Sequence, residues 1–315
     1  MFDAEKFVKE QVAAVSAKVK GKAIIACSGG VDSVVCAVIA SRAIGDRLLA
    51  VYVDTGLMRK GETEEVRNMM AELKVNFKAL DGSKDFFSHL KGVTEPETKR
   101  KIIGERFIRC FEKEAKEFGA EYLVQGTIAP DVIESGKDGK GVVKSHHNVG
   151  GLPKEMKLEL VEPVIDLYKE EVRQVARYLG IKVSERQPFP GPGLSVRCLG
   201  EVTPENIAVV REACYIVEDE IRTAAKEGKM ELPWQYFAAL LPIRSVGVHN
   251  SERVYGRTVV VRAVLTKDAM TAKCANIPFA VLEKISSRIT DTMGDRVNRV
   301  VYDITDKPPA TIEWE

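Results

Sequence analysis

Two glycines stand between hydroxyl and carboxylate side chains near the N-terminus, in the run Ser-Gly-Gly-Val-Asp-Ser at residues 28–33. Gly29 and Gly30 lack the Cβ atoms that would keep an anion away from the backbone. An apolar run of strand length precedes this turn and one of helical length follows it, so a helix is expected to begin near Ser33. Because the N-terminus of a helix offers unpaired N–H groups to an anion, the pattern predicts a phosphate site.

The spacing of the glycines excludes two common phosphate loops. A Walker A loop needs a Lys after its last Gly, and a dinucleotide loop needs G-x-G-x-x-G, and neither is found here. Asp32 lies inside the turn, where a carboxylate beside a phosphate requires a cation between them, and Mg²⁺ suits such hard oxygen ligands. We therefore expect Asp32 to bind Mg²⁺. A glycine-rich turn of purely structural use is the alternative.

The pattern S-G-G-x-D-S resembles the PP-loop of ATP pyrophosphatases. The resemblance implies that the loop holds the β- and γ-phosphates of ATP and leaves the α-phosphorus exposed. The implied chemistry is adenylation of an acceptor, with pyrophosphate as the leaving group.

The elements around this loop alternate between strands and helices, which predicts right-handed βαβ units. The predicted fold class is α/β, a doubly wound parallel sheet with helices on both faces, in which ligands bind at the carboxyl ends of the strands. Strands are expected at 23–26, 47–54, 75–80, 122–125 and 160–163, and helices at 3–19, 62–73, 95–118 and 168–179.

Two irregular stretches interrupt this order. Residues 126–153 lose periodicity and are rich in glycine, which is typical of a lid over a nucleotide, with a surface loop as the alternative. The run Gln-Pro-Phe-Pro-Gly-Pro-Gly at 187–193 can be neither helix nor central strand, so it marks a domain boundary. The predicted domains are 1–187 and 188–315. The second is expected to be a small α+β domain with helices at 203–226 and 279–293 and strands at 235–243, 257–265 and 297–303.

Composition narrows the class of protein further. The 315 residues carry a formal net charge of +1, which gives no overall field for nucleic acid or for an anionic membrane. The six cysteines show no C-x-x-C pairing, as expected of reduced thiols in the cytosol. The N-terminus lacks the apolar segment of a signal peptide, and no stretch reaches the length of a membrane span. We expect a cytoplasmic protein.

Several longer motifs extend the resemblance over practically the whole chain. Together they look like those of the GMP synthetases, and they keep the same order. The motifs are Lys-Arg-Lys-Ile-Ile-Gly at 99–104, Gln-Gly-Thr at 125–127, Pro-Asp-Val-Ile-Glu-Ser at 130–135, Ser-His-His-Asn at 145–148, Phe-Pro-Gly-Pro-Gly at 189–193 and Lys-Pro-Pro-Ala-Thr-Ile-Glu-Trp-Glu at 307–315.

The resemblance implies a reaction and its partners. ATP adenylates the C2 oxygen of XMP, ammonia then displaces AMP, and GMP is formed with release of pyrophosphate. No glutamine amidotransferase domain precedes Met1, so the chain resembles the separate ATP-pyrophosphatase subunit, which needs a glutaminase partner subunit as its source of ammonia. The small second domain is expected to pair with another copy to bury its faces, giving a homodimer.

The resemblance also implies roles for individual residues. Ser28, Asp32, Ser33 and Lys144 are assigned to catalysis, and Asp32 and Asp131 to Mg²⁺. The ATP contacts are assigned to Ser28, Gly29, Gly30, Val31, Asp32, Ser33, Val34, Val53, Asp54, Leu57, Gln125, Gly126 and Thr127. The XMP contacts are assigned to Arg100, Gln235, Lys307, Ile312 and Glu313.

Some of these residues have simpler interpretations. Asp54 and Asp131 are also ordinary turn formers. At most one of His146 and His147 is expected to act in acid–base chemistry, because neighbouring residues rarely face one site. Without the resemblance, Arg100 would be read as part of a solvated helix face.

Three other functions remain as rivals. Another enzyme with this loop, such as NAD synthetase, would need a different acceptor site. A regulatory subunit that binds nucleotide without turnover would not need the carboxylate of Asp32. A tRNA-modifying enzyme would be expected to show a basic face or paired cysteines.

Overall fold

The computed structural model describes residues 2–134, 158–182 and 187–315. These residues form two compact units. Unit 1 contains residues 1–55, 61–82 and 105–186, and unit 2 contains residues 56–60, 83–104 and 187–315. The second unit therefore takes in two segments from the first half of the chain in addition to the C-terminal part.

Unit 1 is built on a five-stranded parallel sheet with the strand order β3-β2-β1-β4-β5. The strands are β1 (Ala23–Ala26), β2 (Leu48–Asp54), β3 (Phe77–Asp81), β4 (Tyr122–Val124) and β5 (Glu159–Val161). The central strands β1 and β2 are buried along nearly their whole length, as apolar β-branched runs in a covered parallel sheet should be. The predicted α/β class and parallel sheet are confirmed.

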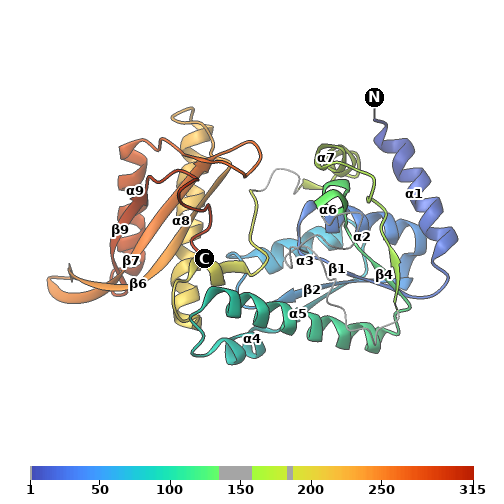
Figure 1. Ribbon diagram of the computed structural model, residues 1–315, viewed down its shortest axis with the longest axis horizontal. Coiled ribbons are helices and arrows are strands. Elements are labelled where there is room, and N and C mark those ends of the chain that lie inside the picture. The colour runs from blue at the N-terminus through green and yellow to red at the C-terminus, as the bar shows by residue number, and fades with distance from the viewer. Residues whose placement is uncertain (1, 135–157, 183–186) are drawn as a thin grey trace. The chain divides into compact units, whose positions relative to one another are not determined.

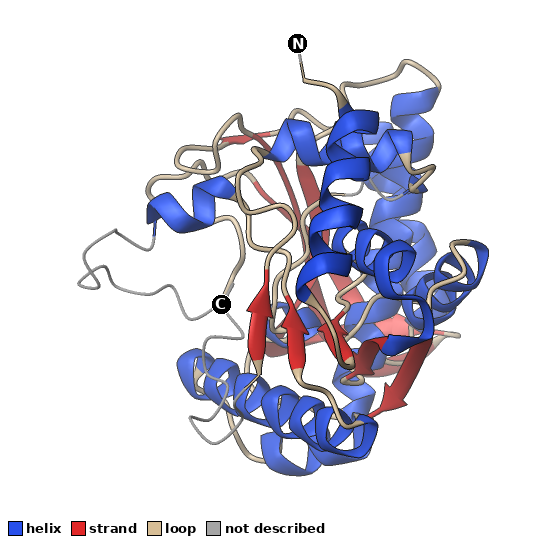
Figure 2. Ribbon diagram, turned by 90° about the vertical axis from the view of Figure 1, so that its right-hand side faces the viewer, coloured by secondary structure: helices blue, strands red, loops and turns tan. Residues whose placement is uncertain are grey.

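Helices cover both faces of this sheet (Figures 1 and 2). The helices α1 (Ala4–Lys18), α2 (Val31–Ile44) and α7 (Lys169–Tyr178) pack against one another. Helix α5 (Pro96–Phe118) runs along the opposite side in Figure 1. The other helices of the first half are α3 (Glu62–Glu72), α4 (Ser83–Leu90) and α6 (Ala129–Glu134). Of these, α4 and α6 fall where no helix was predicted.

The strand order creates a switch point at the centre of the sheet. From β1 the chain moves to β2 and β3 on one side, and it then returns to place β4 and β5 on the other side. The loops that follow β1 and β4 leave the sheet in opposite directions, and a ligand crevice forms at such a point in doubly wound sheets. The loop after β1 is the glycine turn at residues 28–33.

Unit 2 carries its own four-stranded sheet. Its strands are β6 (Gln235–His249), β7 (Glu252–Leu265), β8 (Lys273–Cys274) and β9 (Val297–Asp303), with β6 and β8 antiparallel to β7 and β9 parallel to it. The helices α8 (Pro204–Lys226) and α9 (Phe279–Met293) pack against each other, α8 against β6 and α9 against β9. The α+β character of this region is confirmed, although the β6–β7 hairpin is longer than predicted.

None of the helices in the described part of the chain is long and apolar enough to cross a membrane. The six cysteines are free, and four of them are buried. Buried thiols of this kind pack as small apolar side chains.

Candidate active site

The glycine turn after β1 is held by its own side chains. The Oγ of Ser28 accepts the N–H of Gly30 at 3.3 Å and lies 3.3 Å from the Oγ of Ser33, which donates to the carbonyl of Gly30 at 3.0 Å. Gly29 has a backbone φ of +77°, a conformation that residues other than glycine rarely adopt. The sequence Ser-Gly-Gly-x-x-Ser thus builds the turn from contacts among neighbours, which is why it could be recognised without a structure.

Helix α2 begins at Val31, two residues before the expected start. Its first helical hydrogen bond runs from the N–H of Val34 to the carbonyl of Gly30, at 3.1 Å. The three amides before Val34 lie in the first turn, where a helix has no acceptor of its own for them. These amides, rather than that of Val34, are the donors that the turn offers to an anion.

The loop after β4 approaches the glycine turn closely. A Cβ built on Gly126 would lie 3.1 Å from the carbonyl carbon of Asp32 and 3.2 Å from the N of Ser33, tighter than ordinary packing allows. The predicted neighbours Gln125 and Thr127 are held beside it. The backbone of Gln125 accepts the thiol of Cys36 and donates its amide to Val161, and Thr127 donates its hydroxyl to a carboxylate of Glu162 at 2.5 Å.

The carboxylate of Asp32 has two different environments at its two oxygens. Its Oδ2 accepts the Nζ of Lys169 at 2.6 Å, from the first residue of α7. Its Oδ1 is buried and has no hydrogen-bond partner within the described residues. A buried carboxylate oxygen without a donor is costly, so this atom has unused capacity to accept a cation or another donor.

This arrangement suits Mg²⁺ at Asp32, because the metal prefers carboxylate oxygens and binds few protein ligands alongside phosphate. The second predicted ligand, Asp131, accepts the N–H of Ile128 through its Oδ2 at 3.1 Å, as a turn former does. No cluster of three or more His, Cys, Asp or Glu side chains with metal-site geometry occurs within the described ranges. A metal here would thus depend on phosphate or water oxygens for most of its ligands.

The residues predicted for adenine or ribose lie at the end of β2 and just beyond it. Val53 is buried, and the Oδ2 of Asp54 accepts the hydroxyl of Thr63 at 2.6 Å. Leu57 belongs to unit 2, where its side chain is buried and its carbonyl accepts the N–H of Leu194 at 2.7 Å. Asp54 is therefore part of a local hydrogen bond whether or not it also meets a ligand.

Cys27 directly precedes the glycine turn but is not set up as a nucleophile. Burial raises the pKa of its thiol to about 11, with smaller opposing effects of hydrogen bonds from Gly29 and Ser33. A thiol with that pKa is protonated near neutral pH, and the protonated form is a poor nucleophile.

The C-terminal residues form a second polar cluster, inside unit 2. The Nε2 of Gln235 donates to Oε1 of Glu313 at 2.7 Å, so two of the residues predicted for XMP are in direct contact. Arg197 binds the same carboxylate with two hydrogen bonds, from Nη2 to Oε1 at 2.8 Å and from Nε to Oε2 at 3.0 Å. Ile312 precedes Glu313 in the chain and is 8% exposed.

The far end of the chain is anchored next to Arg100. The Nζ of Lys99 donates to Oε2 of Glu315 at 2.5 Å and to the carbonyl of Cys198 at 2.9 Å. Arg100 follows in α5 and forms an ion pair with Glu97. Arg100 thus directly follows Lys99, the residue that binds the C-terminal Glu315.

Lys307 lies in a different part of unit 2. Its backbone pairs with Ala272, and its Nζ donates to the carbonyl of Ala269 at 2.8 Å. It lines a pocket of about 250 Å³ together with Lys267 and Lys273. The remaining lining residues are Leu265, Thr266, Asp268, Thr271 and Ala272. The Nζ of Lys273 is bound to Asp306 at 2.6 Å, so two of the three lysines already have polar partners.

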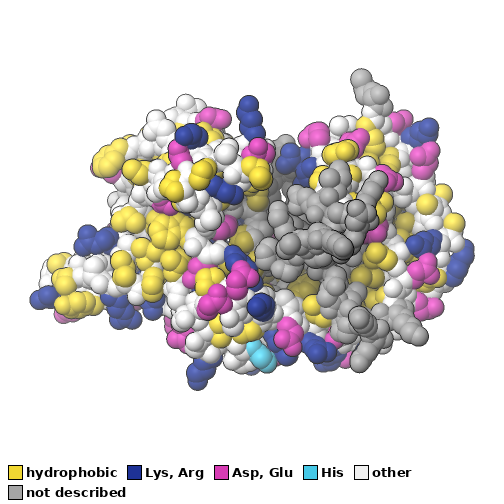
Figure 3. Space-filling model, viewed as in Figure 1, with side chains coloured by type: hydrophobic (Ala, Val, Ile, Leu, Met, Phe, Trp, Pro, Cys, Tyr) yellow, Lys and Arg dark blue, Asp and Glu magenta, His cyan; other side chains and the backbone are white. Residues whose placement is uncertain are grey.

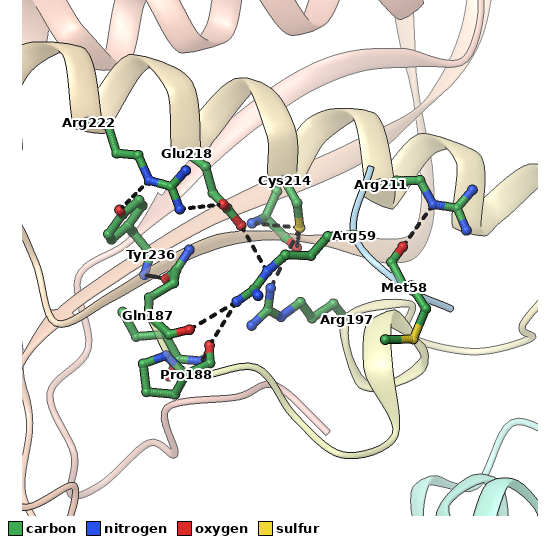
Figure 4. Close-up of polar contacts among 12 residues, drawn as sticks. Met58, Arg59, Gln187, Pro188, Arg197, Arg211, Cys214, Glu218, Arg222 and Tyr236 are labelled. Carbon is green, nitrogen blue, oxygen red and sulfur yellow. Dashed lines mark hydrogen bonds and ion pairs between the residues drawn. The ribbon is translucent and has the colours of Figure 1, made fainter. Parts of the chain in front are cut away.

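A polar network ties the segment after β2 to helix α8 (Figure 4). Arg211 donates to the carbonyls of Gly56 and Met58. Arg59 donates to the carbonyls of Gln187 and Pro188, and its Nε lies 3.6 Å from a carboxylate oxygen of Glu218. These contacts explain why residues 56–60 belong to the second compact unit.

Three of the predicted residues, Lys144, His146 and His147, lie outside the described residues, as does most of the predicted lid. Three others were not predicted: Arg197, Lys99 and Lys169. The run Leu-Ser-Val-Arg-Cys at 194–198 held one signal, a single cation in an otherwise apolar stretch. Lys99 and Lys169 have no such signal, because each lies near a helix start among other charged residues.

Two family models match parts of the chain. The model of the GMP synthase C-terminal domain matches residues 220–314, and the model of NAD synthase matches residues 1–104. The first match covers most of the C-terminal part of unit 2, and the second covers the glycine turn and the strands β1 to β3.

Curated relatives match the chain over its full length. The chain is 56% identical to a subunit, designated B, of the glutamine-hydrolysing GMP synthase of Thermoplasma acidophilum, over 96% of each chain. It is 55% identical to the protein of the same name from Methanopyrus kandleri, over 100% of each, and 56% identical to that from Thermococcus kodakarensis, over 99% of each.

Solved structures give a weaker likeness. NMN synthetase from Francisella tularensis has a TM-score of 0.49 at 14% identity, covering 66% of this chain and 85% of that one. An NH₃-dependent NAD synthetase from Campylobacter jejuni has a TM-score of 0.44 at 15% identity, covering 58% and 76%. At these scores the likeness supports no conclusion about function.

Proposed function

This chain belongs to the family of these GMP synthase subunits, and we propose that it converts XMP, ATP and ammonia to GMP, AMP and pyrophosphate. The observation that carries the proposal is the glycine turn at the switch point of a parallel sheet, with Asp32 and Lys169 paired beside it. Anion-binding amides together with a carboxylate that fits a metal are what ATP chemistry at a phosphorus atom requires.

The proposed reaction has two steps. The C2 oxygen of the xanthine ring is a poor leaving group and must first be activated. It attacks the α-phosphorus of ATP, and pyrophosphate departs. Ammonia then attacks C2 and loses a proton, and AMP departs with the oxygen that was bonded to C2. Both steps are favoured by groups that stabilise the negative charge developing on a departing phosphate.

We assign the pyrophosphate to the glycine turn. The first-turn amides of α2 and the hydroxyls of Ser28 and Ser33 would donate hydrogen bonds to the pyrophosphate oxygens. Lys169 now neutralises Asp32, and a lysine can shift from a carboxylate to a phosphate because its ammonium group is a flexible point charge. Asp32, with Asp131 as the second candidate ligand, would hold Mg²⁺, which would supply neutralisation of the phosphate charge.

The remaining predicted ATP contacts are proposed to enclose the nucleotide. Val53, Asp54 and Leu57, at the end of β2 and beyond it, would meet adenine or ribose, and residues 125–127 would lie against the phosphates. Lys144 is proposed as a further phosphate contact, with at most one of His146 and His147 in proton transfer.

We propose that XMP binds in unit 2. Glu313 accepts a ring N–H, Gln235 pairs with a base or ribose edge, and Ile312 gives the ring an apolar contact. Arg100 and Lys307 are proposed for the 5′-phosphate, because a guanidinium and an ammonium group both suit a phosphate anion.

The name of the relatives, which makes them one subunit of a glutamine-hydrolysing enzyme, supports a separate glutaminase subunit as the source of ammonia. We propose that the chain uses free ammonium when alone and glutamine only with that partner. We also propose that it acts in the cytoplasm, where its nucleotide substrates are found.

We propose further that unit 2 forms a homodimer through its sheet. Hydrophobic side chains gather over the strands of unit 2 and along the hairpin in Figure 3. Val246 and Tyr255 are opposite each other on β6 and β7 and are 43% and 60% exposed, and Val248 is 75% exposed. A second copy would bury this surface. In light scattering after size exclusion, Val248→Glu should convert a dimer to a monomer, whereas a monomeric wild-type protein would contradict the idea.

One experiment tests the reaction itself. The purified chain is mixed with XMP, ATP, MgCl₂ and an ammonium salt, and the products are resolved by chromatography. GMP, AMP and pyrophosphate should appear in equal amounts, and glutamine in place of ammonium should give none. Formation of ADP, or of GMP from glutamine by the chain alone, would contradict the proposal.

A further inference from the structure

Among the described residues, three lysine and arginine side chains are fully buried: Lys99, Arg197 and Arg262, each with 0% exposure. All three bind the last residues of the chain. Arg262 donates to the carbonyl of Thr311 at 3.0 Å and pairs with Asp303, Arg197 binds Glu313, and Lys99 binds Glu315. Residues 311, 313 and 315 are thus held in alternation, each by a different buried cation.

Burying a charge is costly in desolvation, and well-packed apolar residues would often give equal or greater stability. Charged residues at all three positions therefore indicate a need for definite geometry. Arg197 shows this most clearly, because its Nε and Nη2 each donate to a different oxygen of the carboxylate. Such a fork fixes the plane of a carboxylate, which a single lysine nitrogen cannot do.

The surroundings of Arg197 fix the guanidinium group in turn. Its Cζ lies 4.1 Å from the ring centre of Phe237 and 5.3 Å from that of Phe189, and its Nη1 contacts the Sγ of Cys214 at 3.9 Å. Burial lowers the pKa of Arg197, but the charge and hydrogen bonds of Glu313 raise it by more than burial lowers it. The pKa is therefore raised overall, and the group stays charged. Arg197 has no freedom to follow a moving carboxylate.

The carboxylate of Glu313 retains capacity for a ligand. Its Oε1 accepts from both Arg197 and Gln235, whereas its Oε2 accepts from Arg197 alone within the part of the chain that the structure describes. A carboxylate has about four lone-pair sites. The Glu313 side chain is 20% exposed, so it is not sealed from a ligand as Lys99 and Arg197 are.

We propose that Arg197 is a positioning residue for the XMP ring. It acts through Glu313, which it holds in one plane so that the remaining lone pair of Oε2 can accept a ring N–H. The inference rests on the proposed role of unit 2 in binding XMP. It adds that the orientation of Glu313, and not its charge alone, determines affinity.

The test measures XMP and ATP binding separately, by calorimetry on the full-length protein, alongside steady-state kinetics with ammonium. Arg197→Lys keeps the charge and loses the fork. We expect the Kd and KM for XMP to rise about tenfold, as expected for a loss of roughly 1.4 kcal/mol, with the KM for ATP changed less than about twofold. Wild-type XMP affinity in Arg197→Lys would overturn the proposal, as would equal losses for both nucleotides.

A double-mutant cycle distinguishes positioning from a general structural role. Glu313→Gln should weaken XMP binding, and the double variant Arg197→Lys with Glu313→Gln should be no weaker than Glu313→Gln alone, because Arg197 acts through Glu313. Additive losses would overturn the proposal. Glu313→Gln leaves the buried charge of Arg197 without its partner, so circular dichroism first confirms that each variant of the cycle is folded.

Arg222→Met is the matched control. Arg222 is also an arginine of unit 2 that pairs with a glutamate, here Glu218 at 3.0 Å, and it also donates to Tyr236. The XMP affinity of the Arg222→Met variant should equal that of the wild type. If the wild-type protein makes no GMP, the proposed function fails, whereas GMP synthesis with an unchanged Arg197→Lys variant overturns this inference alone.

Discussion

The glycine turn of unit 1 and the C-terminal cluster of unit 2 are both polar sites, but they are assembled in opposite ways. The turn is made by six consecutive residues whose hydroxyls bond to one another and to the backbone between them. The cluster joins Lys99, Arg197, Gln235 and the C-terminal glutamates, which lie far apart in the chain. The turn has partly exposed side chains, whereas the cations of the cluster are fully buried.

This difference indicates where each site takes its precision from. An anion loop needs flexible glycines and free amides, which local geometry supplies. A site that recognises the edge of a ring needs a fixed carboxylate, and a short C-terminal segment cannot fix one by itself. Buried cations supply that rigidity from the surrounding unit. Substitutions in the turn should therefore affect the chemical step, and substitutions in the cluster should affect substrate affinity and stability.

The largest effect is expected from Asp32→Ala in the turn. Loss of the carboxylate removes the partner of Lys169 and the proposed metal ligand, and removal of one such stabilising group costs about 10²–10³ in kcat. The kcat for GMP formation should fall by roughly that factor, with the Kd for XMP within about twofold of the wild type. A comparable fall in XMP affinity would break the contrast between the two sites.

Removal of residues 307–315 should have the next largest effect, mainly on unit 2. It leaves Lys99 and Arg197 buried without Glu315 and Glu313, and an uncompensated buried charge costs about 3–5 kcal/mol. The urea midpoint should fall, and XMP binding should be lost while ATP binding is retained. Equal loss of both nucleotides would count against a substrate role specific to these residues.

The Lys99–Glu315 pair provides a more finely controlled comparison. Lys99→Met should lower the free energy of unfolding by about 3 kcal/mol, because it leaves the carboxylate of Glu315, whose side chain is 8% exposed, without its partner. Adding Glu315→Met should recover most of that loss. The exposed pair Lys6–Glu10 is the control, since Lys6→Met should change stability by less than about 0.5 kcal/mol. Similar losses for both lysines would contradict the importance of burial.

The smallest effect concerns two thiols, one near each site. Burial raises the pKa of Cys27 and of Cys198 to about 11, above the ordinary value of 9.0. The unfolded chain therefore loses these protons first as the pH rises, so the stability that they contribute is complete below about pH 9 and declines toward about pH 11. Thermal midpoints measured from about pH 8 to about pH 10.5 should decline less in Cys27→Ala and Cys198→Ala than in the wild type. An identical decline in all three would contradict the assignment.

The sequence predicted much of the fold because the signals were local. The apolar runs of β1 and β2, the capping Thr203 with Pro204 at the start of α8, and the alternation of strands and helices all correspond to elements of the structure. Helix α4 was missed, because its apolar face is short and lies between two loops. The length of the hairpin was underestimated, because Arg244 and Arg253 interrupt the apolar pattern on its exposed face.

The candidate sites divide in the same way. Ser28 to Ser33 could be singled out from residue types alone, and Gln235 and Glu313 through the family resemblance. Lys99 could not be found by either route, and Arg197 was marked only by being a single cation in an apolar run, because the importance of both depends on partners more than 110 residues away in the chain. Lys169 likewise meets Asp32 across 137 residues.

The sequence by itself determined the glycine turn, the parallel sheet and the identity of the polar residues, since each depends on contacts among near neighbours or on hydrophobic periodicity. Only the tertiary structure decided which charges are buried and which carboxylate each one holds. The reason is physical: the cost of a buried charge and the geometry of its partner are set by the whole environment of the group, and no short stretch of chain contains that environment.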